Sequence, residues 1–131
     1  MNTKVMFSSL SDEWRTPQSL FDKLDKEFNF DSDPCPMTNK PLKKGLFRGY
    51  KNSIFVNPPY SNIKHWVKRA YEIHNMYRPT IVMLIPSRTD TLWWHDYVMK
   101  AKEIRFIKGR LKFSGHKNSA PFPSAIVIFR E

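Results

Sequence analysis

The run of residues 54–60, Ile-Phe-Val-Asn-Pro-Pro-Tyr, constrains the fold more than any other part of the chain. Its first three residues are apolar and two are β-branched, a pattern that predicts a buried strand. Because proline lacks a backbone N–H and fixes φ, Pro58 and Pro59 must end that strand in a stiff, extended arm. The arm presents a carboxamide, two free carbonyls and an aromatic face. We expect them at the carboxyl end of the strand, the edge where open α/β sheets bind ligands.

Predicted helices and strands alternate along the rest of the chain. Helical spacing of apolar residues predicts helices over 17–28, 63–77 and 92–100, with Thr16, Ser61 and Thr91 as N-caps. Further strands are predicted over 28–30, 80–85, 103–107 and 125–129. This order predicts an α/β fold with a mainly parallel sheet. The last two strands are joined by loop residues without a crossover helix, so we expect an antiparallel C-terminal edge pair.

The length and charge of the chain indicate one domain with a polyanionic partner. We expect a loose arm over 1–12 and a single domain over 13–131. Lys and Arg number 22 against 12 Asp and Glu, a formal net charge of +10, which favours nucleic acid but also fits an ordinary basic protein. Cys35 is the single cysteine and no apolar run approaches the length of a membrane span, so we expect a cytoplasmic protein without membrane contact.

Several classes of site are absent from the sequence. Only four glycines are present, and they form neither a Walker loop nor a dinucleotide-binding fingerprint. The four histidines are scattered and Cys35 has no partner at ligand spacing, so no metal site is expected. Nothing in the sequence indicates a nucleophilic triad.

The 57–60 arm suits chemistry on an aromatic amino group. Such a nitrogen is a poor nucleophile because its lone pair is delocalised into the ring. Two acceptors, the Asn57 side-chain oxygen and a backbone carbonyl, can hold its two hydrogens and draw it towards tetrahedral geometry, while Tyr60 stacks on the ring. The same arm also fits a proline-rich turn that caps a strand, or a ligand for proline-reading domains.

Further segments narrow this choice through a resemblance. The arm resembles the catalytic motif of adenine-amino DNA methyltransferases, and residues 13–129 are similar to the small phage-type DNA adenine (N-6) methyltransferase family, which is Dam-like. The resemblance implies a compact Rossmann-like methyltransferase fold, S-adenosylmethionine as methyl donor and double-stranded DNA as substrate. It rests on segments that stand in the family's order, namely 14–17, the turn around Asp33, 57–61, Trp66, 84–91, 94–95, 109–113 and 121–125.

The resemblance also implies roles for individual residues. The catalytic motif is Asn57, Pro58, Pro59 and Tyr60, in which Asn57 and the Pro58 carbonyl grip the adenine amino group and Tyr60 stacks on the flipped base. The donor site corresponds to Trp14, Thr16, Pro17, Asp33, Pro34 and Cys35. Residues 36–38 replace the family's Gly-x-Gly, and 37–50 contain no acid to bind the ribose hydroxyls.

Basic residues near the predicted ligand-binding edge are candidates for phosphate contacts. They are Lys43, Lys44, Arg48, Arg88, Arg110, Lys112 and Lys117. Either a monomer or a homodimer is compatible with the sequence. Two other functions stay open, a non-catalytic DNA-binding module derived from this fold, and an amino-group methyltransferase that acts on cytosine, RNA or protein.

Overall fold

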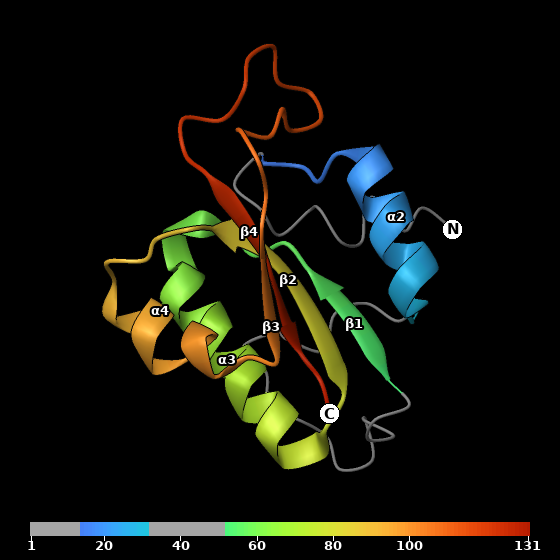
Figure 1. Cartoon of the computed structure of the whole chain (residues 1–131), viewed down its shortest axis with the longest axis vertical. Coiled ribbons are helices and arrows are strands. Elements are labelled where there is room, and N and C mark those ends of the chain that lie inside the picture. The colour runs from blue at the N-terminus through green and yellow to red at the C-terminus, as the bar shows by residue number, and fades with distance from the viewer. Residues whose placement is uncertain (1–13, 32–51) are drawn as a thin grey trace.

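A four-stranded mixed sheet lies between two helical layers in the part of the chain that the structure, a computed structural model, describes, residues 14–31 and 52–131 (Figure 1). The elements in chain order are α2 (Gln18–Phe28), β1 (Ser53–Val56), η2 (Tyr60–Asn62), α3 (Ile63–Tyr77), β2 (Thr80–Pro86), α4 (Leu92–Asp96), η3 (Val98–Lys100), β3 (Glu103–Phe106) and β4 (Ser124–Phe129). The α/β class predicted from sequence is therefore confirmed. No described helix is long and apolar enough to cross a lipid bilayer.

The prediction of a mainly parallel sheet is wrong for the described strands. Their order is β1-β2-β4-β3, in which β1 and β2 are parallel and β4 is antiparallel to both of its neighbours. Strands β1, β2 and β3 thus run in one direction, but β4 separates β2 from β3. All six residues of β4 are buried, whereas β3 is partly exposed, so the more apolar strand takes the interior position. The predicted antiparallel C-terminal edge pair is confirmed as β3 and β4.

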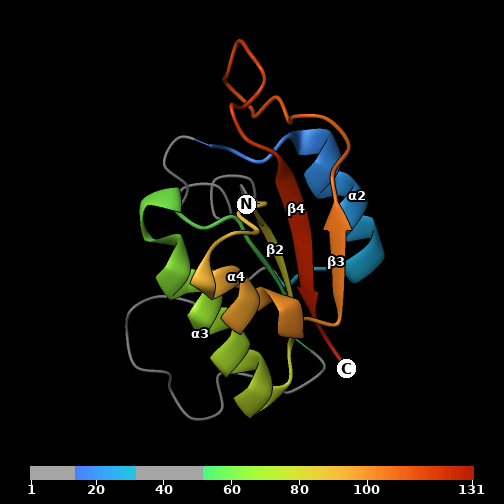
Figure 2. The same ribbon diagram turned by 60° about the vertical axis from the view of Figure 1, so that its left-hand side comes forward.

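The carboxyl ends of β1, β2 and β3 meet at one edge of the sheet. Val56, the last residue of β1, pairs with Met83 in the middle of β2, and Pro86, the last residue of β2, pairs with Ser124 at the start of β4. Phe106, the last residue of β3, pairs with the next residue, Ala125. The segments 57–60, 87–91 and 107–123 therefore leave the sheet at the same edge, and the last of them forms the loop that projects furthest in Figure 2.

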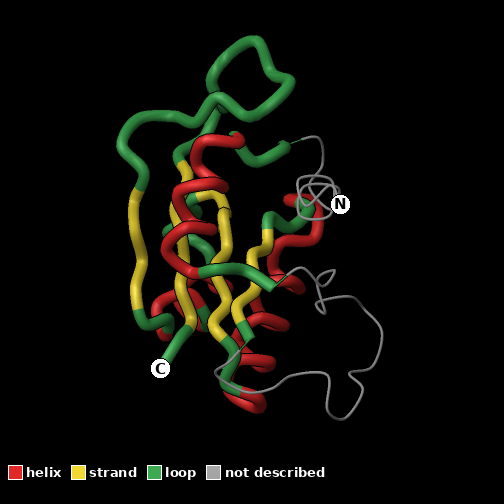
Figure 3. The backbone as a smooth tube through the Cα atoms, turned by 90° about the vertical axis from the view of Figure 1, so that its right-hand side faces the viewer, coloured by secondary structure: helices red, strands yellow, loops and turns green. Residues whose placement is uncertain are grey.

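The two sides of each central strand face different helical layers. Phe55, Val82 and Leu84 pack on the side of α2, while Ile54 and Met83 pack on the side of α3 and α4. Figure 3 shows the strands side by side across the view, with α2 in front of the sheet. This alternation follows from the two-residue period of side chains along a strand. It explains why β1 and β2 are continuous apolar runs.

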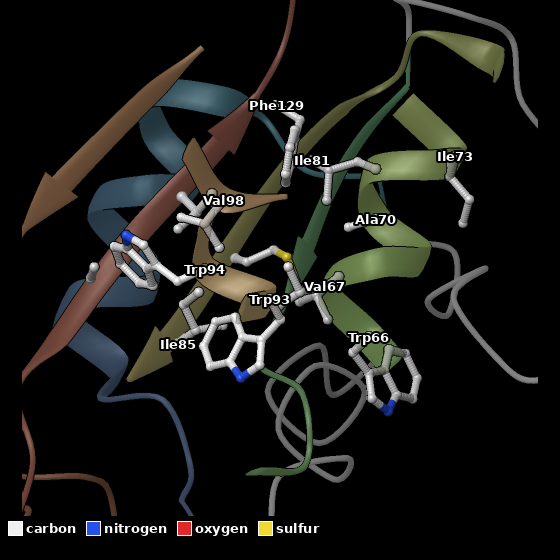
Figure 4. Packing of buried hydrophobic residues seen from close by; sticks show 14 of the residues in the cluster. Trp66, Val67, Ala70, Ile73, Ile81, Ile85, Trp93, Trp94, Val98 and Phe129 are labelled. Atoms are coloured by element: carbon white, nitrogen blue, oxygen red, sulfur yellow. The ribbon is translucent and has the colours of Figure 1, made fainter. Parts of the chain in front are cut away.

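Trp93 and Trp94 are both buried, although adjacent positions on a helix predict that at most one faces the core. Their exposed fractions are 8% and 2%. The α4 helix has only five residues, and the Trp94 ring reaches Phe106 on β3 at a centroid distance of 6.2 Å. Trp93 packs in the cluster with α3 residues such as Val67 (Figure 4). A short helix with partners on two sides can bury successive side chains.

Helix ends differ in part from the sequence prediction. Thr91 caps α4, because its hydroxyl accepts a hydrogen bond from the Trp94 N–H at 3.3 Å. The other two predicted caps are wrong, since α2 begins after Pro17 and α3 after Asn62, both without a side-chain cap, and Ser61 lies within η2. No strand forms over 28–31, where Asn29 ends α2 with a φ of 52°.

An ion-pair network on the surface ties α2 to the edge strand β3. The Arg105 guanidinium donates to both carboxylate oxygens of Glu27, at 2.8 and 2.6 Å, and to Glu103 at 2.5 Å. Hydrogen bonds from Arg105 lower the pKa of the Glu27 carboxyl, and they lower the pKa of the Glu103 carboxyl in the same way.

We predict that Arg105→Met lowers stability at neutral pH, with a loss of about 1 kcal/mol or less for the exposed pair with Glu27. A carboxyl whose folded-state pKa is lowered stabilises the fold above its unfolded pKa, and that contribution disappears as pH falls through the folded pKa. The difference between wild type and variant should therefore shrink below about pH 4. Urea unfolding at pH 7 and pH 3 measures it. Lys102→Met, at an exposed position without an ion pair to described residues, is the control.

Candidate active site

Asn57 lies directly after β1 and its side chain is completely buried. The side-chain nitrogen donates two hydrogen bonds, one to the Trp14 carbonyl at 2.6 Å and one to the Thr16 hydroxyl at 3.0 Å. These partners come from the segment that precedes α2, more than 40 positions earlier in the chain. The segment 14–16 therefore holds the amide in one orientation.

That orientation leaves the Asn57 side-chain oxygen free to accept a hydrogen bond. A backbone carbonyl is an acceptor only, so the amide nitrogen must face Trp14 and the oxygen must face away from it. The oxygen is buried and has no hydrogen-bond partner within residues 14–31 and 52–131. Because an unsatisfied buried acceptor is costly, native proteins keep few of them, and a catalytic role is one of the reasons for keeping one.

The two prolines carry the chain away from the sheet as predicted. Pro59 is extended, with φ −64° and ψ 130°, and its carbonyl accepts from the Asn62 N–H at 3.2 Å. Pro58 is buried, and its carbonyl receives no backbone hydrogen bond from the described residues. The arm thus retains a second acceptor beside the Asn57 side chain.

Tyr60 contributes a ring whose hydroxyl is buried. The ring is nearly parallel to Trp14, at a centroid distance of 6.4 Å, and meets Phe122 edge-on at 5.3 Å. The hydroxyl has no hydrogen-bond partner in the described ranges. Burial raises the pKa of the Tyr60 hydroxyl above its usual range, so the phenol stays neutral at physiological pH and does not act as a base.

Five rings form an aromatic cluster at this edge, and the sequence predicted a site role for only two of them, Trp14 and Tyr60. The imidazole of His116 stacks on Trp14 with a centroid distance of 4.5 Å and an angle of 9°. A lone histidine in a polar loop carries no periodic signal. Its position between Phe113 and Phe122 is the one sequence feature that indicates a place in this cluster. The members of the aromatic cluster are Trp14, Tyr60, Phe113, His116 and Phe122.

The loop 107–123 fixes the segment that holds Asn57. Ser114 forms an isolated antiparallel bridge with Arg15, in which the Ser114 N–H donates to the Arg15 carbonyl at 2.9 Å. The Ser114 hydroxyl donates to the Thr16 carbonyl at 3.1 Å. Gly115 follows with a φ of 85°, a left-handed conformation that favours glycine. The orientation of the Asn57 amide therefore depends on a loop far away in sequence.

The structure brings some of the sequence-predicted binding residues to this edge. Trp14 and Thr16 adjoin Asn57, and Pro17 stands at the start of α2. Four of the predicted DNA-binding residues are exposed and form no ion pair with described residues, namely Arg88, Arg110, Lys112 and Lys117. Outside the described residues lie Asp33, Pro34, Cys35, Lys43, Lys44 and Arg48.

The part of the chain with described side chains contains no group of three or more His, Cys, Asp or Glu that could hold a metal ion. The chemistry offered at this edge is that of neutral acceptors beside aromatic faces. Among the described residues the Asn57 side-chain oxygen has no hydrogen-bond partner and the Pro58 carbonyl receives no backbone hydrogen bond, and aromatic rings pack beside this arm.

Comparisons with known proteins agree with this chemistry. The family model described as DNA N-6-adenine-methyltransferase (Dam) matches residues 3–131. A relative named DNA N-6-adenine-methyltransferase, from Haemophilus phage HP1 (strain HP1c1), is 33% identical over 145 aligned residues, which cover 98% of this chain and 82% of the relative. No solved structure matches the chain significantly.

The hydrogen bond to Trp14 predicts that Asn57→Asp is destabilising above acidic pH. A carboxylate at this position would face the Trp14 carbonyl oxygen in a buried site, which raises the folded-state pKa of the new carboxyl above its unfolded value of about 3.9. A raised pKa destabilises the fold as pH rises, so the variant should match wild type near pH 3. It should lose about 3 kcal/mol at pH 7, the scale of an uncompensated buried charge.

Denaturant unfolding at both pH values measures this difference. Asn62→Asp is the matched control, because Asn62 is exposed at the start of α3, where a negative charge is favourable. Equal stability of Asn57→Asp and wild type at pH 7 would contradict the orientation of the amide.

Proposed function

Since the chain belongs to the DNA N-6-adenine-methyltransferase (Dam) family, we propose that the 57–60 arm is the site that binds the target amino group through hydrogen bonds. The carrying observation is the Asn57 side-chain oxygen, which is buried and lacks a hydrogen-bond partner among the described residues. The reaction is transfer of a methyl group from S-adenosylmethionine to the exocyclic nitrogen of adenine in double-stranded DNA. The infected host cell's cytoplasm is where a phage-type enzyme meets that substrate.

The arm activates the amino group through two hydrogen bonds. The Asn57 oxygen accepts one hydrogen of the adenine amino group and the Pro58 carbonyl accepts the other. Holding both hydrogens on one side draws the nitrogen from planar towards tetrahedral geometry and localises its lone pair opposite the acceptors. The dipoles are already fixed, because Trp14 and Thr16 orient the amide before substrate arrives. After methyl transfer the surplus proton leaves the nitrogen for solvent.

Tyr60 supplies the face on which the base stacks. An adenine within a duplex cannot reach the arm, so it must be flipped out at a cost of a few kcal/mol. Stacking on an aromatic side chain offsets part of that cost, at about 1–3 kcal/mol per base. Because its phenol stays neutral, Tyr60 offers this surface without adding a charge.

The described residues of the predicted donor site adjoin the proposed amino-group site, which supports direct methyl transfer between them. Trp14 and Thr16 contact Asn57, and the Trp14 ring packs against Tyr60, so this segment and the amino-group site share one edge. S-adenosylmethionine supplies an electrophilic methyl group on a sulfonium. We propose that Trp14, Thr16 and Pro17 border its methionine end, with Asp33, Pro34 and Cys35, which lie outside the described residues, completing the site.

The proposal also includes the residues that contact DNA phosphates, the type of fold and the oligomeric state. Arg88, Arg110, Lys112 and Lys117 are exposed around it and would neutralise phosphates of the duplex. The predicted Lys43, Lys44 and Arg48 would add to them. The unit β1–α3–β2, a helix between two parallel strands, supports a Rossmann-like methyltransferase fold for the domain, which would act as a monomer or a homodimer.

The proposal predicts that the protein with S-adenosylmethionine converts adenine in duplex DNA to its N6-methyl form, and that Asn57→Ala lowers kcat at least about a hundredfold. The loss should fall on kcat because the amide acts on the reacting nitrogen. DNA affinity should change little, since the residue is buried away from the phosphates. Mass spectrometry of digested DNA measures the product.

Calorimetric titration with S-adenosylmethionine separates the other functions. DNA binding without donor binding would indicate a non-catalytic module, and methylated cytosine, RNA or protein in place of adenine would identify another acceptor. Full activity of Asn57→Ala would refute the role of the arm.

Thr16 is a positioning residue for this reaction, and we predict that Thr16→Val lowers kcat about tenfold while leaving KM for DNA nearly unchanged. The variant keeps the shape of the side chain but removes the oxygen that receives the Asn57 N–H. Thr16→Ser restores that acceptor and should retain most of the activity. Steady-state kinetics measures the split between kcat and KM.

Thr80→Val, at the opposite end of the sheet, is the matched control and should be neutral. A failure of Thr16→Ser to restore kcat would show that Thr16 acts through packing rather than through its hydroxyl.

A further inference from the structure

A pocket of about 480 Å³ lies at the same edge of the sheet, next to the aromatic cluster. Pro86 is the last residue of β2 and Pro123 directly precedes β4. The pocket therefore lies beyond the end of β2 and the start of β4, the two central strands. Phe122 belongs both to the pocket and to the aromatic cluster, where it meets Tyr60 at 5.3 Å. The pocket is lined by Pro86, Ser87, Arg88, Asp90, Pro121, Phe122 and Pro123.

Hydrogen bonds hold the walls of this pocket in place. The Ser87 N–H donates to the Pro123 carbonyl at 2.9 Å, which joins the two loops that form it. The Arg88 carbonyl accepts from both the backbone N–H and the hydroxyl of Thr91, at 3.2 and 2.7 Å. The His95 ring is hydrogen-bonded to the Thr89 carbonyl at 2.8 Å. The pocket is therefore formed before any ligand arrives, which lowers the entropic cost of binding.

The lining combines an apolar wall with unpaired polar groups. Arg88 and Asp90 are two positions apart and exposed, yet neither forms an ion pair with the described part of the chain. The Ser87 hydroxyl is buried and has no hydrogen-bond partner there. These groups match the parts of a nucleotide. A guanidinium binds a phosphate, a carboxylate and a hydroxyl form hydrogen bonds with the edge of a base, and a phenyl ring packs on its face.

We propose that this pocket binds the nucleotide adjacent to the target adenine in the same strand, and that Asp90 determines which base is accepted there. The inference rests on the proposed function. Phe122 separates the two positions, and the short distance between Phe122 and Tyr60 allows one strand to occupy both. Arg88 contacts the phosphate of the adjacent nucleotide.

The Asp90 carboxylate accepts hydrogen bonds and donates none, so it selects a base with an exocyclic amino group. Adenine and cytosine present such a group in the major groove, whereas guanine presents only acceptors there and thymine an oxygen and a methyl group. Guanine or thymine at this position would place an oxygen against the carboxylate.

The test is methylation of a duplex library in which both nucleotides that flank a single adenine are randomised. At one flank, wild type should prefer adenine and cytosine over guanine and thymine about tenfold. Asp90→Asn replaces one carboxylate oxygen with a donor and should reduce that preference below about twofold. Arg88→Ala should raise KM for every flanking base alike. Lys102→Ala, a cation removed at the opposite end of the sheet, should change neither quantity.

A second readout separates this inference from the proposed function. Affinities of the same variants for short DNA strands that differ at the flanking base are measured without S-adenosylmethionine. An absence of methyladenine with an Asp90-dependent binding preference would overturn the proposed reaction but keep the pocket. Methylation with no flanking preference in wild type, or with the preference intact in Asp90→Asn, would overturn the pocket.

Discussion

The hydrogen bond from the Asn57 side chain to the Trp14 carbonyl is the contact on which the site depends. It joins the end of β1 to the segment before α2, and it decides which atom of the amide is left without a hydrogen-bond partner among the described residues. The same segment is bridged to Ser114. The end of β1, the segment before α2 and the loop 107–123 are therefore joined around the Asn57 carboxamide. An asparagine on an untethered arm could turn either its oxygen or its nitrogen outward. Only the first orientation accepts hydrogens from an amino group.

This arrangement keeps unsatisfied polar atoms in an apolar setting. The Asn57 oxygen and the Tyr60 hydroxyl are both buried without hydrogen-bond partners among the described residues. Each costs stability that an apolar side chain would not, on the order of 1–3 kcal/mol. The sheet beneath offsets this cost, since β2 and β4 are almost entirely buried between the two helical layers. A dense core thus supports an edge where buried polar atoms have no hydrogen-bond partner among the described residues.

Local patterns in the sequence predicted most elements but not how they pair. The bounds of α3 and the buried runs of β1, β2 and β4 follow from periodicity and apolar content. The insertion of β4 between β2 and β3 depends on a comparison of burial between strands, which no local window contains. The arm was recognisable because two prolines restrict its backbone. The tether from Trp14 and the stacking of His116 were not, because both depend on partners 43 or more positions away.

The central place of β4 also determines when the molecule can fold during synthesis. This strand pairs with Ile81 through its residue Phe129 and separates strands made much earlier. Until residues 124–129 have left the ribosome, β2 lacks one neighbour and β3 lacks its only described partner. The backbone groups along these strand edges therefore stay unpaired on the nascent chain. The loop that bridges to Arg15 is likewise anchored by β4. Activity should therefore appear abruptly, in a single folding event that follows synthesis of β4, rather than grow as the chain lengthens.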